Sequence, residues 1–501
     1  MMADSAAASK SPLSIAKRAL SLAVAISCAA AGVIGANAAP ATTVMIRCIV
    51  GLLSAPSFTD SNAALFAAAA STLVDEGAPK AQHRSGMTEF EHFDIAIIGG
   101  GLAGGLAALA LQARGFSCAV VDAQDPSLMG GQGFDGRTTA ISYASARVFK
   151  RLGLWDAITP GAEAIRDIVV TDGRAKGRFD DGAISTFQLH FDSRELGDDQ
   201  PLGWIVENQL LRKTLNNAIA GAEHISMLAP ARRASTRYES AQAVIELEDG
   251  RSLATTLVVA ADGRFSSLRA EANIKVNQWR YKQTGIVVTV AHERSHQGVA
   301  QEFFLPSGPF AILPLTDNRS SLVWTERADA APAFLSLDED DFRREIENRF
   351  GPYLGKLKVV GKRWSYPLAF HLAQSYIAPR LALIGDAAHA IHPIAGQGYN
   401  LGVKDIAALA DVLRDARELG LDIGSLSVLD DYQRWRRFDS ASLALGTDLL
   451  NRLFSNDIGP LRLARDIGMG AIGKIAPLRK MFMRQAGADL GKLPSLMAAE
   501  S

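Results

Sequence analysis

A short apolar strand that runs into a glycine loop places the strongest constraint on how this chain folds. Residues 93–98, FDIAII, precede GGGLAG at 99–104, and an Ala- and Leu-rich helix then stops at Gly115. A second apolar run, over 116–121, ends in Asp122. Strand, glycine turn, helix, strand and acid together predict one βαβ unit of a parallel sheet.

This unit has the residues that a nucleotide's pyrophosphate needs. Gly99, Gly101 and Gly104 lack a Cβ, so backbone N–H groups at a helix N-terminus can approach an anion closely. Asp122, 18 residues beyond Gly104, is placed to accept hydrogen bonds from a ribose. The segment GQGFDG at 131–136 spells the same pattern, but a polar stretch precedes it, so we expect no second nucleotide fold there.

Two later strands also end in glycine and aspartate. The apolar run 257–261 is followed by Asp262 and Gly263, and the run 381–384 is followed by Gly385 and Asp386. In an open α/β sheet, ligands bind at the carboxyl ends of the strands. We therefore expect these pairs beside the first glycine loop, with the Asp386 carboxylate holding hydroxyl groups of a second part of the same cofactor.

The stretch after this strand, HPIAGQGYNLGVKD, combines a glycine loop with a helix start. Gly396, Gln397 and Gly398 leave the backbone exposed just before a helix that we predict from Asn400 to about Leu419. Amides in such a position can hydrogen-bond the electron-rich edge of a ring or stabilise a developing anion.

Arg137 begins the run RTTAISYASARVFKRLG, which we predict as helical. Near a helix start, its guanidinium is suited to a phosphate or a ring carbonyl. The alternative is a solvated surface arginine.

Other kinds of site fit the residues less well. His389 and His392 have no third ligand at chelating spacing, so we predict no metal site. The sequence contains no GxSxG nucleophile elbow, which excludes the common Ser-His-Asp hydrolase pattern. Cys28, Cys48 and Cys118 are not at metal-ligand or disulfide-framework spacing, which is typical of a reducing compartment.

The organisation of the chain indicates two packed units. Its 501 residues are 48% hydrophobic, and the segments 284–292, 300–305 and 309–325 alternate as antiparallel strands do. We expect these strands to form a sheet inserted into the α/β domain. The net charge of −1 argues against nucleic-acid binding, which needs an excess of Lys and Arg.

The first 86 residues differ from the rest. No charged residue occurs between positions 19 and 46, and alanine dominates there. A secretory signal, a weakly hydrophobic membrane segment or a transit peptide fits this composition. The alternative is upstream sequence, with the working chain beginning at Met87.

With these motifs in order, the chain resembles the class A flavoprotein monooxygenases, and within them the ubiquinone-biosynthesis hydroxylases. The resemblance is carried by ADGRFSSLR at 261–269, LALIGDAAH at 381–389 and the complete signature HPIAGQGYNLGVKD at 392–405. DGRTTAIS, LGWIVENQLLRKTL and FFLPSGPFAILPL add to it. It covers about residues 93–485 and leaves out the N-terminal 86.

The resemblance implies a Rossmann-like α/β FAD-binding domain made of residues 87–165, 201–275 and 368–450. It implies an inserted antiparallel-sheet substrate domain at 166–200 and 276–367. A helical C-terminal region at 451–501 completes the predicted fold.

The resemblance also implies the chemistry. NAD(P)H or another donor reduces FAD, dioxygen adds to give a flavin 4a-hydroperoxide, and a phenol or quinone precursor with a polyprenyl tail is hydroxylated on its ring. Catalytic side chains stay unidentified, although Pro393, Gly396 and Gln397 are flavin-loop candidates. The patterns and the resemblance together assign cofactor contacts to Gly99, Gly101, Gly104, Asp122, Arg137, Asp262, Gly263, Gly385, Asp386, Pro393, Gly396, Gln397, Gly398, Asn400 and Leu401.

Tyr281, His292 and Tyr399 are candidates for a general base, although a packing or surface role suits each of them at least as well. Two other functions stay open. One is hydroxylation of a soluble phenol, and the other is a non-catalytic flavin-bound scaffold subunit.

A polyprenyl substrate implies contact with a membrane surface. The segment 460–484 carries six basic residues and one acid among apolar ones, which suits an interfacial helix or a helix packed on the domain. We expect a cytoplasmic protein, peripheral on the inner membrane face (mitochondrial in a eukaryote). Other ubiquinone-biosynthesis proteins are possible partners.

Overall fold

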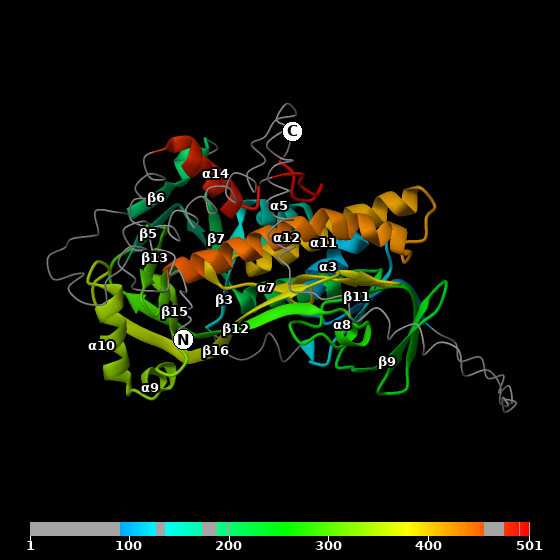
Figure 1. Ribbon diagram of the computed structural model, residues 1–501, viewed down its shortest axis with the longest axis horizontal. Coiled ribbons are helices and arrows are strands. Elements are labelled where there is room, and N and C mark those ends of the chain that lie inside the picture. The colour runs from blue at the N-terminus through cyan, green and yellow to red at the C-terminus, as the bar shows by residue number, and fades with distance from the viewer. Residues whose placement is uncertain are drawn as a thin grey trace, which may run out of the picture.

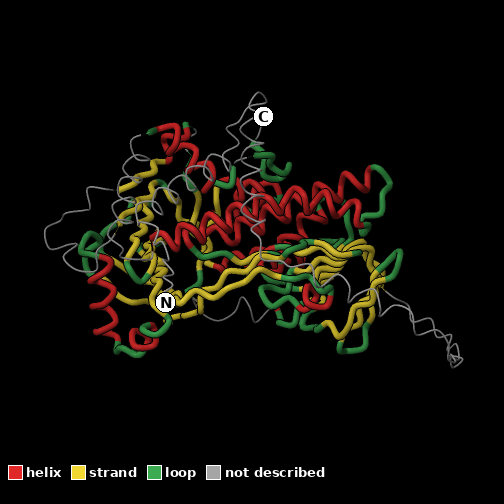
Figure 2. Tube along the Cα trace, viewed as in Figure 1, coloured by secondary structure: helices red, strands yellow, loops and turns green. Residues whose placement is uncertain are grey.

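A computed structural model describes residues 91–126, 136–172, 188–197, 200–454, 475–489 and 491–499. Figures 1 and 2 show that these residues build two large sheets with helices around them. The predictions for residues 1–86, for the loop at 131–135 and for most of 460–484 fall outside the described residues.

The first sheet has the predicted parallel core. The strand order β18-β11-β1-β2-β8 is parallel throughout, with the short β17 antiparallel at one edge and the hairpin of β9 and β10 attached to β11. Parallel strands are covered on both faces and therefore read as continuous apolar runs, and Ile95, Ala96 and Ile97 are fully buried. The bounds are β1 Glu91–Ile98, β2 Cys118–Val121, β8 Ile225–Leu228, β9 Arg233–Tyr238, β10 Ala243–Leu247, β11 Ser252–Ala260, β17 Ile377–Ala378 and β18 Leu381–Leu383.

Helices pack against this sheet and extend beyond it. α3 (Leu102–Gln112) lies between the sheet and two partners, α7 (Asn208–Ala220) and α11 (Gln397–Glu418). The long α12 (Leu426–Phe454) packs along α11, and its C-terminal end reaches the second sheet (Figure 1). There the Asn451 amide donates to Gln283 Oε1 at 3.1 Å, so this helix links the two units.

The second sheet is the predicted antiparallel one. Its order is β19-β16-β12-β15-β14-β13-β5-β6, antiparallel except between β13 and β5. This confirms the predicted α/β fold with an antiparallel sheet. The predicted boundary between residues 367 and 368 falls inside β16, so the exact domain limits stay a prediction. The bounds are β5 Asp167–Asp172, β6 Gln188–Asp192, β12 Val276–His292, β13 Val299–Leu305, β14 Gly308–Leu315, β15 Arg319–Arg327, β16 Leu357–Ala373 and β19 His389–Ala390.

The two faces of this sheet differ. α9 (Ala331–Leu335) and α10 (Glu339–Phe350) cover one of them, as Figure 1 shows at the left. We call it the closed face; its central side chains are Phe303, Leu305, Phe310, Ile312, Leu322 and Trp324, all buried. The alternate residues form the open face, with Val170, Glu302, Ala311, Val323 and Val287 in one row across five strands.

A small third sheet corrects one prediction. The run that begins at Arg137 does not start as a helix, because residues 138–142 form β3 and the helix begins only at Tyr143. The segment TTAIS is rich in β-branched residues, which favour strands, and it pairs with β7 more than sixty residues away. The sheet consists of β3 (Thr138–Ser142), β7 (Gly203–Glu207) and β4 (Ala162–Ile165).

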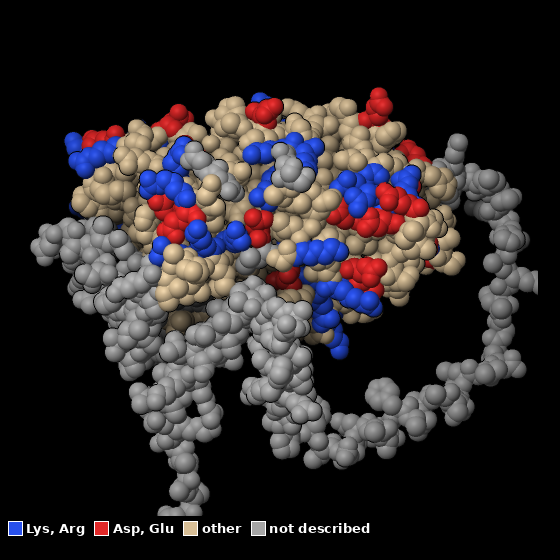
Figure 3. Space-filling view, turned by 90° about the horizontal axis from the view of Figure 1, so that it is seen from above, with Lys and Arg blue, Asp and Glu red and all other residues tan. Residues whose placement is uncertain are grey.

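The remaining described elements are short. They include α5 Tyr143–Arg151, α6 Trp155–Ile158, α8 Ser267–Glu271 and the 3-10 turns η1 Thr159–Gly161, η2 Ser193–Leu196, η3 Gly385–Ala387 and η4 Ile394–Gly396. No helix in the described ranges is long and apolar enough to cross a bilayer. On the face in Figure 3, acidic and basic side chains are interspersed, as the net charge leads one to expect.

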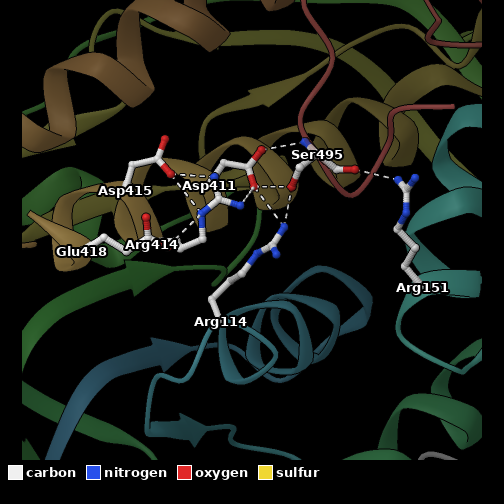
Figure 4. Close-up of polar contacts among 7 residues, drawn as sticks. All are labelled: Arg114, Arg151, Asp411, Arg414, Asp415, Glu418 and Ser495. Carbon is white, nitrogen blue, oxygen red and sulfur yellow. Dashed lines mark hydrogen bonds and ion pairs between the residues drawn. The ribbon is translucent and has the colours of Figure 1, made fainter. Parts of the chain in front are cut away.

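The C-terminal segment is fastened to the first unit. After α14 (Ala476–Ala486), the chain returns over α5 and α11, and Figure 4 shows Ser495 at the centre of a polar cluster. Its N–H donates to Asp411 Oδ2 at 2.6 Å, and the Arg151 guanidinium donates to its carbonyl at 2.6 Å. Arg114 bridges Asp411 and the Ser495 hydroxyl. The predicted helical C-terminal region is only partly helical, since α14 ends at Ala486 and residues 491–499 form no helix. These last residues pack over the first unit.

Candidate active site

The four predicted loops meet at one edge of the parallel sheet. β18, β11, β1 and β2 are consecutive neighbours, so the loops after them lie side by side at their carboxyl ends. The Gly99 N–H donates to the Val121 carbonyl at 2.8 Å, and the Ala261 N–H donates to the Ile98 carbonyl at 2.9 Å. The prediction that the glycine and aspartate pairs share one edge is confirmed.

The glycine loop is built so that only glycine fits at its two ends. Gly99 has φ +102°, and a Cβ there would lie 2.4 Å from the Ala261 carbonyl oxygen. A Cβ on Gly104 would lie 1.8 Å from the Gly99 oxygen. Gly101 is different, because a Cβ there would meet nothing within 4 Å. The loop therefore packs tightly against the protein and leaves open space above the N-terminus of α3, where an anion is favoured.

Asp122 is oriented by the same loop. Its Oδ2 accepts the Gly100 N–H at 2.6 Å, and its Oδ1 accepts the Gln124 N–H at 2.7 Å. A carboxylate oxygen accepts more than one hydrogen bond, so both oxygens keep capacity for the hydroxyls of a ribose.

The Asp262 loop contributes structure as well as position. Asp262 Oδ2 accepts the N–H of Ser267, the first residue of α8, at 2.9 Å, while its Oδ1 has no hydrogen-bond partner among the described residues. Arg269, at the end of this motif, donates to the Ala387 carbonyl at 2.8 Å and to the Arg264 carbonyl at 2.9 Å. Arg269 thus ties the loop after β11 to the loop after β18, a role that we did not predict.

Asp386 presents its carboxylate to solvent at this edge. The side chain is exposed, yet dense protein around it raises the pKa of the carboxyl, while the nearby His389 and Arg264 oppose that shift. Gly385 before it has φ +56°, and a Cβ on Gly402 of α11 would lie 3.2 Å from the Gly385 Cα. α11 therefore packs directly on the turn that presents Asp386.

A buried ionic network holds this turn. Asp405 Oδ2 accepts the Gly385 N–H at 3.1 Å and pairs with His389 Nε2 at 2.6 Å, while its Oδ1 accepts from Arg436 Nε at 2.8 Å. Asp405 and Arg436 are completely buried. Burial works against the ionised carboxyl, but His389 and Arg436 hold the pKa of Asp405 below its ordinary value. Asp405 closes the signature that we quoted, although we did not predict its role.

The loop from Pro393 to Gly398 is held between β3 and α14. Gly396 has φ +61°, and a Cβ there would lie 2.8 Å from the Cβ of Ala140 in β3. Asn400 donates to the Ala140 carbonyl at 2.9 Å and accepts the Ser142 N–H at 2.9 Å. Its buried amide is thus engaged with β3, so a cofactor contact at Asn400 would come from its backbone. Gln397 is also buried and donates to the Ala486 carbonyl of α14 at 2.9 Å.

The N-terminus of α11 is open at one point. A Cβ on Gly398 would meet nothing within 4 Å, and amides in the first turn of a helix have no partner within it. Pro393 is half-buried beside this turn, whereas Leu401 is buried. The predicted exposed backbone before the helix thus lies within its first turn, because α11 begins at Gln397 and not at Asn400. Gly263 is open as well, with φ +82° and nothing within 4 Å of a Cβ.

Arg137 lies at the border between the two units. It is exposed, and its guanidinium carbon is 5.9 Å from the ring centroid of Trp364. Trp364 on β16 is the cross-strand neighbour of Val287, the last residue of the open-face row. A phosphate or ring contact at Arg137 stays a prediction.

The three side chains considered as general bases are all engaged. The Tyr281 hydroxyl donates to Asp448 at 2.7 Å, and the Tyr399 hydroxyl donates to the Leu102 carbonyl at 3.3 Å. Burial raises the pKa of both hydroxyls. His292 bonds the Arg294 carbonyl through Nδ1 and the Ser320 hydroxyl through Nε2. Each therefore supports local structure.

The histidines of the signature are engaged in the same way. His389 joins the Asp405 network, and His392 Nδ1 accepts the Ile394 N–H at 3.4 Å. Burial lowers the pKa of His392 to about 4, so its ring is neutral at pH 7. In the described ranges, no group of three His, Cys, Asp or Glu side chains, with either histidine or elsewhere, is placed to hold a metal ion.

These features together fit a dinucleotide such as FAD. The glycine loop and Asp122 suit an adenosine diphosphate, Asp386 suits the hydroxyls of a linker, and the start of α11 suits a ring edge that carries electron density. The fit rests on the shape of the loop, in which Gly99 and Gly104 leave no room for a Cβ and Gly101 leaves the space above it free.

Comparison with known proteins agrees with this site. Residues 92–439 match the family model described as "FAD binding domain". p-Nitrophenol 4-monooxygenase PnpA from Pseudomonas putida superposes with a TM-score of 0.65 over 79% of this chain and 99% of its own, at 19% identity. At that identity the likeness concerns the fold alone.

Closer relatives come from sequence. Ubiquinone hydroxylase UbiL from Rhodospirillum rubrum is 45% identical, covering 79% of this chain and 90% of the relative. 3-Demethoxyubiquinol 3-hydroxylase from Escherichia coli is 34% identical, covering 78% and 98%, and the Homo sapiens mitochondrial monooxygenase COQ6 of ubiquinone biosynthesis is 32% identical, covering 80% and 93%. The chain belongs to the class A FAD-dependent aromatic hydroxylases, in their ubiquinone-biosynthesis family.

Proposed function

We propose that this protein is an FAD-dependent monooxygenase that hydroxylates the aromatic ring of a polyprenylated phenol in ubiquinone biosynthesis. The observation that carries the proposal is the convergence of four loops at one sheet edge around the space above Gly101. The names of the relatives supply the substrate class.

When bound, reduced FAD activates dioxygen for transfer of one oxygen atom to an electron-rich ring. The protein's residues bind and orient this cofactor. The backbone over Gly99–Gly104 receives the pyrophosphate, Asp122 receives a ribose, and Asp386 receives the linker hydroxyls. The open start of α11 at Gly398 stabilises negative charge that develops on the ring edge, because helix-terminal amides point there.

NAD(P)H is the proposed electron donor, and a polyprenyl phenol or quinone precursor is the proposed substrate. The open face of the second sheet supports an apolar substrate, since Val170, Ala311 and Val323 are only half-buried there. Apolar side chains that remain partly exposed next to a cofactor loop suit a ligand with a hydrocarbon tail.

A position on a membrane surface is part of the proposal. Phe438, Leu445 and Ile475 are exposed apolar side chains, and α14 carries Lys480 and Arg484 facing solvent. Flotation of the full chain with anionic vesicles tests this point. The triple change of Phe438, Leu445 and Ile475 to Ser should weaken vesicle binding, and unchanged flotation would contradict a role for these side chains.

The cofactor itself is tested by Gly101→Leu. Since nothing lies within 4 Å of the added Cβ, the variant is expected to fold normally while its side chain fills the pyrophosphate space. We expect the purified wild-type chain to show flavin absorbance and to form hydroxylated product with NAD(P)H and dioxygen, and the variant to lose the flavin with an unchanged circular dichroism spectrum.

Gly446→Ala is the matched control, because a Cβ there also meets nothing within 4 Å but the residue lies in α12. It should keep its FAD. A folded wild-type protein without flavin would overturn the proposal. Flavin with turnover of small soluble phenols only would move the substrate class away from polyprenyl phenols.

A further inference from the structure

An acid lies in the middle of the row that crosses the open face of the second sheet. Glu302 lies on β13 between Ala300 and Phe304, which point to the same side as it does because side chains alternate along a strand. Its direct cross-strand neighbours are Val170 on β5 and Ala311 on β14. The rest of the row, Val323 and Val287, is apolar as well, so a carboxylate occupies the middle of an apolar surface.

The neighbours of Glu302 place it next to the loop from Pro393 to Gly398, which we call the flavin loop. Phe304 packs with Ile394 of that loop, and Val170 and Leu453 lie against the same cluster. On the other side, Ala300 packs with Leu315 and with Met483 of α14. Glu302 therefore stands between two apolar clusters, one of which includes the loop that is proposed to lie beside the flavin ring.

No described residue forms an ion pair or a side-chain hydrogen bond with Glu302. Solvent reaches the side chain in part, but apolar neighbours surround the carboxyl, and this desolvation raises its pKa to about 7. A buried acid that serves only the fold is normally paired or hydrogen-bonded. Glu302 meets neither condition, so the fold alone gives no reason for it.

Three titratable groups on the surrounding elements are distant, neutral or already paired. Arg137 lies over Trp364 at the far end of the row, four strands away, which is roughly 19 Å. His392, just before the flavin loop, is neutral at pH 7. Arg452 on α12 pairs with Asp448 at 2.8 Å.

We propose that Glu302 receives the ring hydroxyl of the substrate and accepts its proton during hydroxylation. This inference rests on the proposed function. The O–H bond of the phenol breaks and an O–H bond forms on the Glu302 carboxylate, so electron density moves onto the ring carbon that takes the oxygen atom. That carbon later gives its own proton to solvent water and the ring becomes aromatic again. Glu302 then returns the proton that it holds to the phenol oxygen and is ready for another turnover.

The position of Glu302 also defines how the substrate lies. With its hydroxyl at Glu302, the ring fits between the open face and the loop that contains Ile394, and the hydrocarbon tail extends over Val170, Ala311 and Val323. A general base is most effective when its pKa is close to the working pH, which is the condition that the apolar surroundings create for Glu302.

The test compares Glu302→Gln and Glu302→Asp with the full wild-type chain, using 2-geranylphenol and its methyl ether as probes. Loss of a general base lowers turnover by about 10²–10⁴-fold, so we expect a drop of that order in kcat for Glu302→Gln. In the wild type, kcat should rise with pH through about 7, and the variant should lack this step. Glu302→Asp should recover part of the rate.

Binding separates the proton acceptor from a merely structural residue. By flavin absorbance titration, 2-geranylphenol should bind more weakly to Glu302→Gln than to the wild type, whereas the methyl ether, which has no proton to give, should bind equally to both. Glu246→Gln, an exposed acid on β10, is the matched control and should behave as wild type.

The outcomes are distinguishable. A wild-type protein that lacks FAD or forms no hydroxylated product overturns the proposed function, and this inference with it. An active wild type whose rate, pH step and phenol affinity survive in Glu302→Gln overturns the inference alone.

Discussion

The closed and open faces of the second sheet are made by the same strands, but they differ in how deeply their side chains are buried. On the closed face, Phe310, Leu322 and Trp324 are fully buried and pack against Phe342 of α10. On the open face, four of the five residues of the central row are half-buried, and one of these four is Glu302. The difference shows that one strand can stabilise the fold with every second residue and leave the residues between for ligands.

This comparison predicts opposite responses to mutation. Changes on the closed face should lower stability and leave the chemistry of each folded molecule alone. Changes on the open face should alter turnover and leave stability nearly constant or even raise it.

The largest expected effect on stability comes from Phe342→Ala. This side chain is completely buried against Trp324, with ring centroids 6.0 Å apart, and removing a buried Phe typically costs about 3–5 kcal/mol. Urea unfolding of the FAD-loaded protein measures the loss, while kcat per bound flavin should stay unchanged. A stable but inactive variant would contradict the separation of the two faces.

An intermediate effect is expected from Ala311→Phe on the open face. Ala311 is half-buried and lies directly across from Glu302, so a phenyl ring there occupies the place proposed for the substrate. We expect KM for 2-geranylphenol to rise roughly tenfold, equivalent to about 1.4 kcal/mol. The thermal midpoint serves as the control, because it should move by no more than about 2 °C.

A smaller effect links Glu302 to stability. Its folded-state pKa is raised to about 7 by desolvation, so the folded protein binds the proton more tightly than the unfolded chain does. Stability from this group is present at low pH and is lost as pH rises through about 7. Glu302→Gln should therefore raise the thermal midpoint by roughly 2 °C at pH 8.5 and have little effect at pH 5. The reverse dependence would mean that Glu302 is paired in solution.

The smallest effect is expected where neither face is involved. Phe265 is 91% exposed in the loop after β11, and Phe265→Ala should change the free energy of unfolding by less than about 0.5 kcal/mol. Chemical denaturation beside Phe342→Ala measures it. A large loss would show that the exposed ring has a partner in solution.

Sequence reasoning succeeded where the signal is local. Gly99, Gly104, Asp122 and Asp386 follow short apolar strands, and a parallel sheet brings the ends of such strands to one edge whatever lies between them. The FAD-binding fold could therefore be predicted from segments of about ten residues each.

It failed where pairing is distant. The run after Arg137 is compatible with a helix or a strand when it is considered alone. The pairing with Gly203–Glu207 makes residues 138–142 a strand. Glu302 was missed for a similar reason, since QEFF does not reveal which side of the strand is covered by α10. Asp405 lies within a quoted motif, but its bonds to His389 and Arg436 join three separate elements.

The order of the strands has a consequence for how the cell makes this protein. β11 lies between β1 and β18 in the sheet. Along the chain, however, β1 and the loop at Gly99 leave the ribosome long before β18, the strand that precedes Asp386. Until that strand arrives, β10 pairs with residues 252–255 on that edge of β11, but residues 258–260 have no partner there and are open to other chains. Ser495, which fastens the first unit, is translated after β18. The four loops of the predicted cofactor site are therefore complete only after β18 has been made, and a message that ends before β18 yields a chain in which part of the β11 edge stays unpaired.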